Sequence, residues 1–410
     1  DRPGARGDQC DDCGKTLNPD ELLGPMCRIC GTSPEFRDSE HFFLRLSALQ
    51  KRLLHWVDKQ NHWRPNVLNF TRRYLQDGLK DRAITRDLLW GIPIPVDGYD
   101  DKRIYVWFEA VTGYLSAAVE WAQEQGKPNA WERFFKDSGT KAYYFIGKDN
   151  IPFHTIIWPA MLMGDDELML PHDVPANEFL NLEDAKLSTS RNWAVWLPDY
   201  LERYTPDPLR YVLAATMPET SDSNFSWTDF VRRNNQELVA TYGNMVHRVL
   251  TMTYRNFDGQ FPEPHDLDKE DNQLLEKLPQ VLKEAGDRLG ACNFRQALRA
   301  AMTLAQDTNR YIDTKAPWRT LKTDRGRTGT TLWVCLNVIS CLRTIMYPFL
   351  PFSSQQLHKL LGFTGEIQNS GWRIHKLNPC QNFPPPKPLF PKLEDSLVEE
   401  ETTRLRTQAE

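Results

Sequence analysis

Residues 143–158 read YYFIGKDNIPFHTIIW, and residues 186–191 read KLSTSR. The first stretch opens on an apolar, aromatic-rich run that predicts a buried strand. It continues through Gly147-Lys148-Asp149 into an apolar, helix-like run that ends at Trp158. The second stretch places three hydroxyl groups and two cations within six residues, and these are groups that bind a polyphosphate. A short polar segment of this kind is more often a solvated loop, so its interpretation as a phosphate-binding site depends on the first stretch.

Together the two stretches resemble the catalytic core of the class I aminoacyl-tRNA synthetases, specifically the methionyl-tRNA synthetase family. Residues 186–191 match that class's Lys-Met-Ser-Lys-Ser loop, and Phe145 to Trp158 is similar to the strand and helix behind the methionine pocket. The resemblance extends from Ala5 to about Leu361, with the motifs in the family's order. It implies a ligase that activates methionine with ATP and Mg²⁺, forms methionyl-adenylate, and transfers the methionyl group to tRNA(Met) for protein synthesis in the cytoplasm.

Composition allows this activity without requiring it. The 410 residues suffice for two or three domains, and a 40% hydrophobic content supports real cores. The net charge of −5 argues against a generic basic nucleic-acid binder, although local basic patches suffice for tRNA. No run approaches the length expected of a membrane span, and no secretory leader is visible at the N-terminus.

The resemblance implies an α/β fold, a partial Rossmann-like class I synthetase catalytic domain with a zinc knuckle, followed by an all-α anticodon-binding helix bundle. The expected domains are a zinc-knuckle part of the connective insertion at 1–36, the C-terminal half of the catalytic domain at 37–226, a helical anticodon-binding domain at 227–375, and a Pro-rich connector with a charged tail at 376–410. The tail is expected to be solvated or to form one helix.

Periodicity supports this division. A strand at 103–108 followed by a helix at 110–125 predicts a unit of a parallel sheet, whose ligands lie at the carboxyl ends of strands. The bundle is predicted from four long helical patterns, at 229–257, 269–289, 293–315 and 328–346.

Two Cys-x-x-Cys pairs, Cys10 with Cys13 and Cys27 with Cys30, predict a zinc site, because thiolates are good tetrahedral ligands. The resemblance implies that they are the third and fourth of four knuckles in a two-zinc form, where each shares its metal with an earlier pair. Since those earlier pairs are absent from this sequence, either each of the two pairs lacks its partner pair, or all four cysteines bind one zinc. The remaining cysteines are scattered and predicted to be free thiols, which suits a reducing compartment; they are Cys292, Cys335, Cys341 and Cys380.

The class I signature His-Ile-Gly-His is absent from the sequence, and the family places it before the knuckles. We therefore expect that this chain, which starts at Asp1, lacks the N-terminal half of the ATP site. The fragment alone is expected to be inactive.

The resemblance assigns the catalytic loop and the substrate pocket residue by residue. The loop would bring cations and hydroxyls to the phosphates through Lys186, Ser188, Thr189, Ser190 and Arg191. Thr189 stands where the commonest family version has lysine, which removes one cation near pyrophosphate. Positions that match the family's methionine and ribose subsites are Trp107, Ala110, Tyr114, Asp149, His154 and Trp158, with Arg86 in a supporting role. On composition alone these tryptophans and the histidine would be ordinary core residues.

Four residues of the helical region match the family's anticodon readers. Asn244 and Arg248 are four apart and share a helix face, and Pro317 and Trp318 follow a helix break. Splayed anticodon bases stack on aromatic rings and bond to Asn and Arg side chains.

Two other functions compete with the ligase. One is a non-catalytic tRNA-binding or zinc protein derived from the same architecture, which upstream sequence would discriminate. The other, a synthetase for leucine, isoleucine or valine, is disfavoured because no large editing insertion is visible and residues 107–110 and 316–318 fit methionine better.

Overall fold

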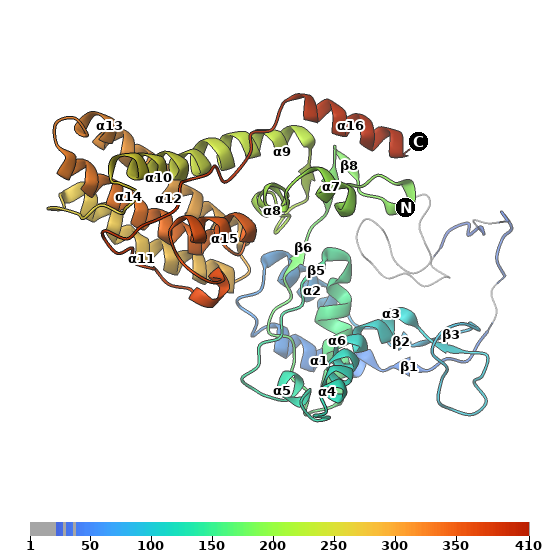
Figure 1. Ribbon diagram of the computed structural model, residues 1–410. Coiled ribbons are helices and arrows are strands. Elements are labelled where there is room, and N and C mark those ends of the chain that lie inside the picture. The colour runs from blue at the N-terminus through green and yellow to red at the C-terminus, as the bar shows by residue number, and fades with distance from the viewer. Residues whose placement is uncertain (1–21, 28–29, 36–37, 410) are drawn as a thin grey trace. The chain divides into compact units, whose positions relative to one another are not determined.

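The computed structural model describes residues 22–27, 30–35 and 38–409. The chain forms two compact units, which divide between Asn177 and Glu178. Figure 1 shows the elements of each unit, and the units are described separately below.

The first unit is a mixed assembly of helices and short strands. Its strands are β1 (Phe43–Leu44), β2 (Arg82–Ala83), β3 (Thr85–Arg86), β4 (Arg103–Ile104), β5 (Ile146–Gly147) and β6 (Ala176–Asn177). Its helical segments are α1 (Leu46–Val57), α2 (Pro65–Gln76), α3 (Val106–Glu109), η2 (Ala110–Thr112), α4 (Gly113–Glu124), α5 (Glu132–Phe135), η3 (Lys148–Asn150), η4 (Phe153–Ile157) and α6 (Trp158–Gly164).

The core of the first unit joins α1, α2 and α6. Leu53 of α1, Val67 of α2 and Ala160 of α6 are almost completely buried in one apolar cluster. The hydroxyl of Thr71 in α2 donates to that of Thr155 in η4 at 2.9 Å, which satisfies two buried polar groups at once. This contact fixes the helix that carries His154.

Two strand predictions in this unit need correction. The apolar run 104–108 is not a strand: β4 ends at Ile104, and Val106 begins the helix α3. A short apolar run is compatible with both a strand and a helix, so composition does not distinguish the two states. The predicted strand at 143–146 is found in part, since Tyr143 forms a parallel bridge with Asp173 but β5, paired in parallel with β6, begins only at Ile146.

The second unit combines a small sheet with a helix bundle. The sheet has the order β8-β7-β9 and contains β7 (Leu180–Leu182), β8 (Ala185–Lys186) and β9 (Ser223–Phe225). The helical segments are η5 (Thr189–Arg191), α7 (Leu197–Arg203), α8 (Pro206–Ala215), α9 (Trp227–Arg233), η6 (Asn234–Gly243), α10 (Asn244–Asn256), α11 (Lys269–Gly290), α12 (Phe294–Lys315), α13 (Pro317–Thr320), α14 (Arg325–Met346), α15 (Pro351–Leu360), η7 (Ile367–Ser370) and α16 (Ser396–Ala409).

Helix α14 is the centre of the bundle. It packs against α10, α11, α12, α13 and α15, and nearly every side chain from Thr328 to Met346 is buried. Its length and composition would allow it to cross a membrane, contrary to the expectation that no run approaches a span, but 94% of its apolar window is buried inside the protein. Its apolar character on all sides therefore belongs to a helix surrounded by other helices.

Asp271 near the start of α11 ties three helices together. With Asp268 it forms a reciprocal capping box at the helix N-terminus. Its carboxylate is fully buried and accepts hydrogen bonds from the hydroxyl of Tyr311 in α12, at 2.7 Å, and from Arg327 in α14. The charge is thus paired and hydrogen-bonded, as a buried carboxylate must be.

The long predicted helices lie close to the expected bounds, but one of them is divided into three segments. The pattern at 229–257 is observed as a run of three segments, α9, the π-helix η6, and α10. The charged tail contains a helix, which the sequence allowed, but one face of this helix is buried and not solvated. Residues 396–409 form α16, which packs against α9 and buries Leu397, Glu401 and Leu405 on one face.

Candidate functional site

An aromatic and polar cluster in the first unit surrounds His154. The Nδ1–H of His154 donates to the backbone oxygen of Asn150 at 2.9 Å, so its Nε2 accepts from the hydroxyl of Tyr114 at 2.7 Å. Tyr144 packs edge-on against the Tyr114 ring at 4.9 Å, and its hydroxyl accepts from the indole of Trp158 at 3.0 Å. These bonds assign one tautomer to the histidine and fix the ring orientations.

Burial decides the charge state of this cluster. Burial lowers the pKa of His154 below its ordinary value, and the hydrogen bond to Asn150 only partly offsets this effect. Burial also raises the pKa values of Tyr114 and Tyr144. The cluster is therefore neutral at neutral pH, as suits an apolar ligand.

The local backbone explains how His154 reaches Tyr114. Residues Phe153–Ile157 form the π-helix η4, a widened turn that is often found at functional sites. Tyr114 comes from α4 and Trp158 from the first turn of α6. The structure thus brings together Tyr114, His154 and Trp158, three of the residues that the sequence placed in one pocket.

The other predicted pocket residues have different surroundings. Trp107 is 51% exposed, and its ring lies 5.8 Å from that of Phe153, next to His154 in sequence. Ala110 and Asp149 are exposed. Arg86 lies over the ring of Tyr105 at 3.8 Å and donates to backbone oxygens of its own segment.

The residues predicted to form the catalytic loop begin at the end of one hairpin of the second unit and continue into a second hairpin. Strands β7 and β8 pair in antiparallel fashion through a two-residue turn, Glu183-Asp184, in which both residues have positive φ. Lys186 ends β8, with its ammonium 5.1 Å from the ring centroid of Phe179. Lys186, Thr189, Ser190 and Arg191 are exposed, and Ser188 is half-buried.

Two backbone hydrogen bonds close the second hairpin, which follows β8. Ser188 and Trp193 exchange N–H···O bonds of 3.0 and 2.9 Å. Between them Thr189–Arg191 form one turn of 3₁₀-helix, and Asn192 adopts a left-handed conformation with φ 53°. We call residues 186–193 the KLSTS hairpin.

Three of the predicted anticodon residues lie on one surface of the helical region. Asn244 and Arg248 are exposed on α10. The Arg248 guanidinium lies 5.6 Å from the ring of Trp318, which is 42% exposed, and 3.5 Å from Asp313. Pro317 is buried at the first position of α13, after Ala316 in a left-handed conformation, and this turn directs Trp318 outward.

The predicted zinc ligands are only partly covered, since Cys10 and Cys13 lie outside the described residues. Hydrogen bonds lower the pKa of Cys30 to about 7. The largest contribution comes from the Thr32 hydroxyl, followed by the Thr32 amide and the Cys27 thiol. Among the residues that the structure describes, no three metal-binding side chains meet. None of the four scattered cysteines, all within the described residues, is part of a disulfide, as predicted.

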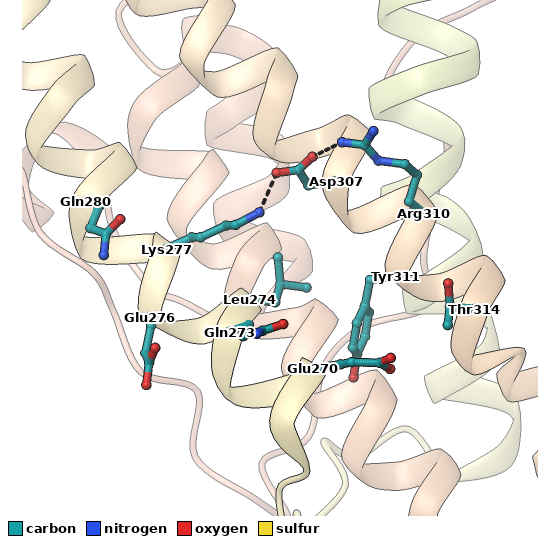
Figure 2. A pocket seen from close by; sticks show the side chains of 10 residues that line it. All are labelled: Glu270, Gln273, Leu274, Glu276, Lys277, Gln280, Asp307, Arg310, Tyr311 and Thr314. Atoms are coloured by element: carbon teal, nitrogen blue, oxygen red, sulfur yellow. Dashed lines mark hydrogen bonds and ion pairs between the residues drawn. The ribbon is translucent and has the colours of Figure 1, made fainter.

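A polar groove of about 510 Å³ between α11 and α12 contains none of the predicted site residues. Figure 2 shows Asp307 of α12 between two cations, Lys277 at 2.9 Å and Arg310. The charges of Asp307, Lys277 and Arg310 in this groove are therefore paired with one another.

Sequence reasoning missed several partners of the predicted residues. Asn150 precedes His154 by four residues, a helical spacing that could have revealed their contact. Tyr144 was seen only as part of a strand. Asn192, which follows the predicted loop, bonds to a residue over two hundred positions later, and no local pattern indicates that contact.

Comparison with known proteins agrees with these features. The family model "tRNA synthetases class I (M)" matches residues 1–250, and the model "Anticodon binding domain of methionyl tRNA ligase" matches residues 261–410. The methionine–tRNA ligase of Dehalococcoides mccartyi strain 195 is 58% identical over 402 residues, which cover 98% of this chain and 72% of the relative. That of Thermomicrobium roseum is 50% identical over 434 residues, covering 99% of this chain and 74% of the relative.

A solved structure, Mycobacterium tuberculosis methionyl-tRNA synthetase bound by methionyl-adenylate, superposes with a TM-score of 0.79 at 26% identity. The match covers 92% of this chain and 75% of that one. These matches confirm the expected fold class, with a class I catalytic domain followed by a helical anticodon-binding region. The chain belongs to the methionine–tRNA ligases, the class I aminoacyl-tRNA synthetases specific for methionine.

Proposed function

We propose that the Tyr114–His154 cluster of this methionine–tRNA ligase holds the methionine side chain, and that the KLSTS hairpin meets the phosphates of ATP. The assignment of the ligase activity rests on the 58% identity to a methionine–tRNA ligase over 98% of the chain. No observation favours the alternative of a non-catalytic tRNA-binding or zinc protein. The partners we infer are methionine, ATP with Mg²⁺, and tRNA(Met), and we infer a cytoplasmic location.

The hydrogen-bonded aromatic cluster supports the methionine site. A flexible, polarisable thioether makes favourable contacts with aromatic rings. Tyr114 and Trp107 supply partly exposed rings, and Trp158 is buried beside Tyr114. Neutral His154 keeps the Tyr114 hydroxyl directed toward Nε2, so the cluster presents no unpaired charge to an apolar ligand. Ala110 and Asp149 would complete this subsite, with Arg86 supporting it.

Methionine affinity is expected to fall as the pH is lowered through the range below 6.5, the ordinary pKa of histidine. Protonated Nε2 cannot accept from Tyr114, so the cluster must rearrange and carry a charge. Because the folded-state pKa is depressed, the stability from neutral His154 is present above 6.5 and is lost as the pH falls through the depressed value. Calorimetric titration of methionine from about pH 8 to about pH 5 measures the effect.

The matched variants for this titration are His154→Gln and His62→Gln. Glutamine at position 154 keeps a donor and an acceptor without a titratable ring, so the pH dependence should disappear. His62 is exposed, and its replacement should leave the dependence unchanged. A pH dependence that survives in His154→Gln would contradict the assignment.

The exposed groups of the KLSTS hairpin support the phosphate role. Lys186 and Arg191 supply two cations, and Ser188, Thr189 and Ser190 supply hydroxyls that donate to phosphate oxygens. Catalysis by such groups is positioning and charge stabilisation, since the methionine carboxylate itself attacks the α-phosphate. With threonine at position 189, more of the stabilisation falls on Lys186, Arg191 and Mg²⁺.

Zinc is proposed for the segment that we assign as a knuckle, residues 1–36. The lowered pKa of Cys30 and the neighbouring Cys27 thiol fit a metal that binds thiolates. Cys10 and Cys13 would complete four ligands. We assign the zinc no part in the chemical step.

Protein purified without chelator is expected to contain about one zinc per chain if all four cysteines share the ion. Metal analysis by mass spectrometry measures it, and Cys30→Ser should lower the content whereas Cys380→Ser, at an exposed free thiol, should not. Absence of zinc together with two disulfides among these four cysteines would contradict the proposal.

The juxtaposition of Arg248 and Trp318 supports an anticodon-reading role for the region that we assign as residues 227–375. Trp318 offers a stacking face, and Asn244 and Arg248 offer hydrogen bonds to base edges. We assign residues 37–226 to the catalytic domain and 376–410 to the C-terminal segment.

A further inference from the structure

The C-terminal helix α16 is anchored on the second unit by a buried carboxylate. Glu401 is 3% exposed and accepts from Nε and Nη2 of Arg203, both at 3.0 Å, and from the hydroxyl of Tyr204 at 2.8 Å. Burial, together with the bond to Glu401, raises the pKa of Tyr204 to about 12. Leu397 and Leu405 are buried on the same face, one helical turn before and after. In Figure 1 the helix runs alongside α9.

The last turn of α16 reaches the end of the KLSTS hairpin. Nε2 of Gln408 donates to the backbone oxygens of Asn192, at 3.2 Å, and Ala194, at 2.6 Å. In return, Nδ2 of Asn192 donates to the backbone oxygen of Gln408 at 2.6 Å. The last carbonyls of a helix need partners outside it, and Asn192 supplies one. Each segment thus satisfies polar groups of the other.

Asn192 is the position at which the hairpin turns back. Its left-handed φ of 53° is accessible to asparagine at modest cost, and neighbouring contacts must hold it. Its Oδ1 also accepts from the indole of Trp196 at 2.7 Å. Gln408 of α16 therefore bonds to the side-chain nitrogen and the backbone oxygen of Asn192, and Trp196 bonds to its side-chain oxygen. Because Arg191 and the hydroxyls at 188–190 directly precede Asn192, the conformation of this turn determines where they lie.

We propose that α16 is a brace for the KLSTS hairpin, in which Gln408 is a positioning residue that holds Asn192 in its left-handed turn and so sets where Lys186 and Arg191 meet ATP. The proposal rests on the phosphate role proposed above for the hairpin. The brace itself is a property of the hydrogen bonds between residues 192–194 and Gln408. It therefore has a readout that does not depend on catalysis.

The first readout is amide hydrogen exchange of Ser188 and Trp193, whose N–H groups close the hairpin. Gln408→Ala removes two donated bonds while keeping a good helix former, and exchange at both amides is expected to accelerate about five- to tenfold. Gln408→Lys, which retains a donor able to reach the carbonyls, should restore most of the protection. Thr407→Ala is the control, because the Thr407 hydroxyl bonds within its own helix.

The second readout is the split between kcat and KM in methionine-dependent ATP–pyrophosphate exchange by the catalytically active protein. Gln408→Ala should lower kcat several-fold and leave the KM for methionine unchanged, with recovery in Gln408→Lys. Exchange rates at Ser188 and Trp193 that equal those of the unmodified protein would overturn the brace. Accelerated exchange with an unchanged kcat, in a protein that Lys186→Ala inactivates, would overturn the positioning role. Accelerated exchange in a protein that Lys186→Ala leaves active would instead show that the hairpin's phosphate role is wrong.

Discussion

Replacement of Lys186 by alanine is expected to slow methionyl-adenylate formation by a factor on the order of 10²–10³, the usual loss when one preorganised electrostatic group is removed. Lys186 ends β8 in an exposed position with its ammonium over the ring of Phe179, and a phosphate can therefore approach it from solvent. The negative charge that it stabilises grows as the α-phosphate is attacked. The rate constant should therefore fall much more than methionine binding weakens.

Rapid-quench measurement of adenylate formation at saturating ATP separates these quantities. Lys186→Arg keeps the charge and should retain part of the rate. Lys283→Ala removes an exposed lysine on α11 that pairs with Asp287, and it serves as the matched control. An unchanged rate constant with raised Michaelis constants would show that Lys186 contributes uniform binding and no specific stabilisation of the transition state.

Replacement of Trp318 by alanine is expected to weaken binding of a CAU anticodon stem-loop by about 1–3 kcal/mol, the usual value of one base stacked on an aromatic ring. Arg248→Ala should cost a charge-assisted bond and relax the choice among anticodons. Because the guanidinium of Arg248 lies over the Trp318 ring, the two replacements should not be additive, and the double variant should lose less than their sum.

Lys322→Ala is the control for this experiment. Lys322 is exposed near α13, and a cation that meets only phosphate should weaken all stem-loops about equally and reduce the salt dependence. Binding is measured at fixed salt for the CAU stem-loop and for a variant with one changed base. Equal affinity of the unmodified protein for both would remove the anticodon role and leave Trp318 as a partly packed surface residue.

The bundle was more predictable than the catalytic unit. Helices α11, α12 and α14 have long patterns with caps or breaks at their ends, and their bounds lie within a few residues of those expected. The strands of the first unit are two residues long, which is too short for an alternating pattern of apolar and polar side chains to be recognised. The π-helices η4 and η6 were also invisible, because widening a turn changes hydrogen-bond partners without changing residue types.

The candidate site was predictable where family motifs named residues, and less so where the fold joins distant segments. Tyr114 and His154 are forty positions apart, the resemblance assigns both to one pocket, and the hydrogen bond between them agrees with that assignment. The burial of Glu401 was not foreseen, because an acidic run usually marks a solvated surface. Its partners on α7 precede it by almost two hundred residues, and local composition carries no trace of them.

The central position of α14 also bears on how the nascent chain matures. Its partners α10, α11 and α12 precede it in the sequence, so the ribosome delivers them before this 22-residue apolar helix emerges. A circularly permuted chain that began at Arg325 would reverse that order. It would present a segment with the length and composition of a membrane span before any helix existed to cover it, and such segments are substrates for membrane insertion. Synthesis order thus places three of the covering helices ahead of the apolar segment that they cover.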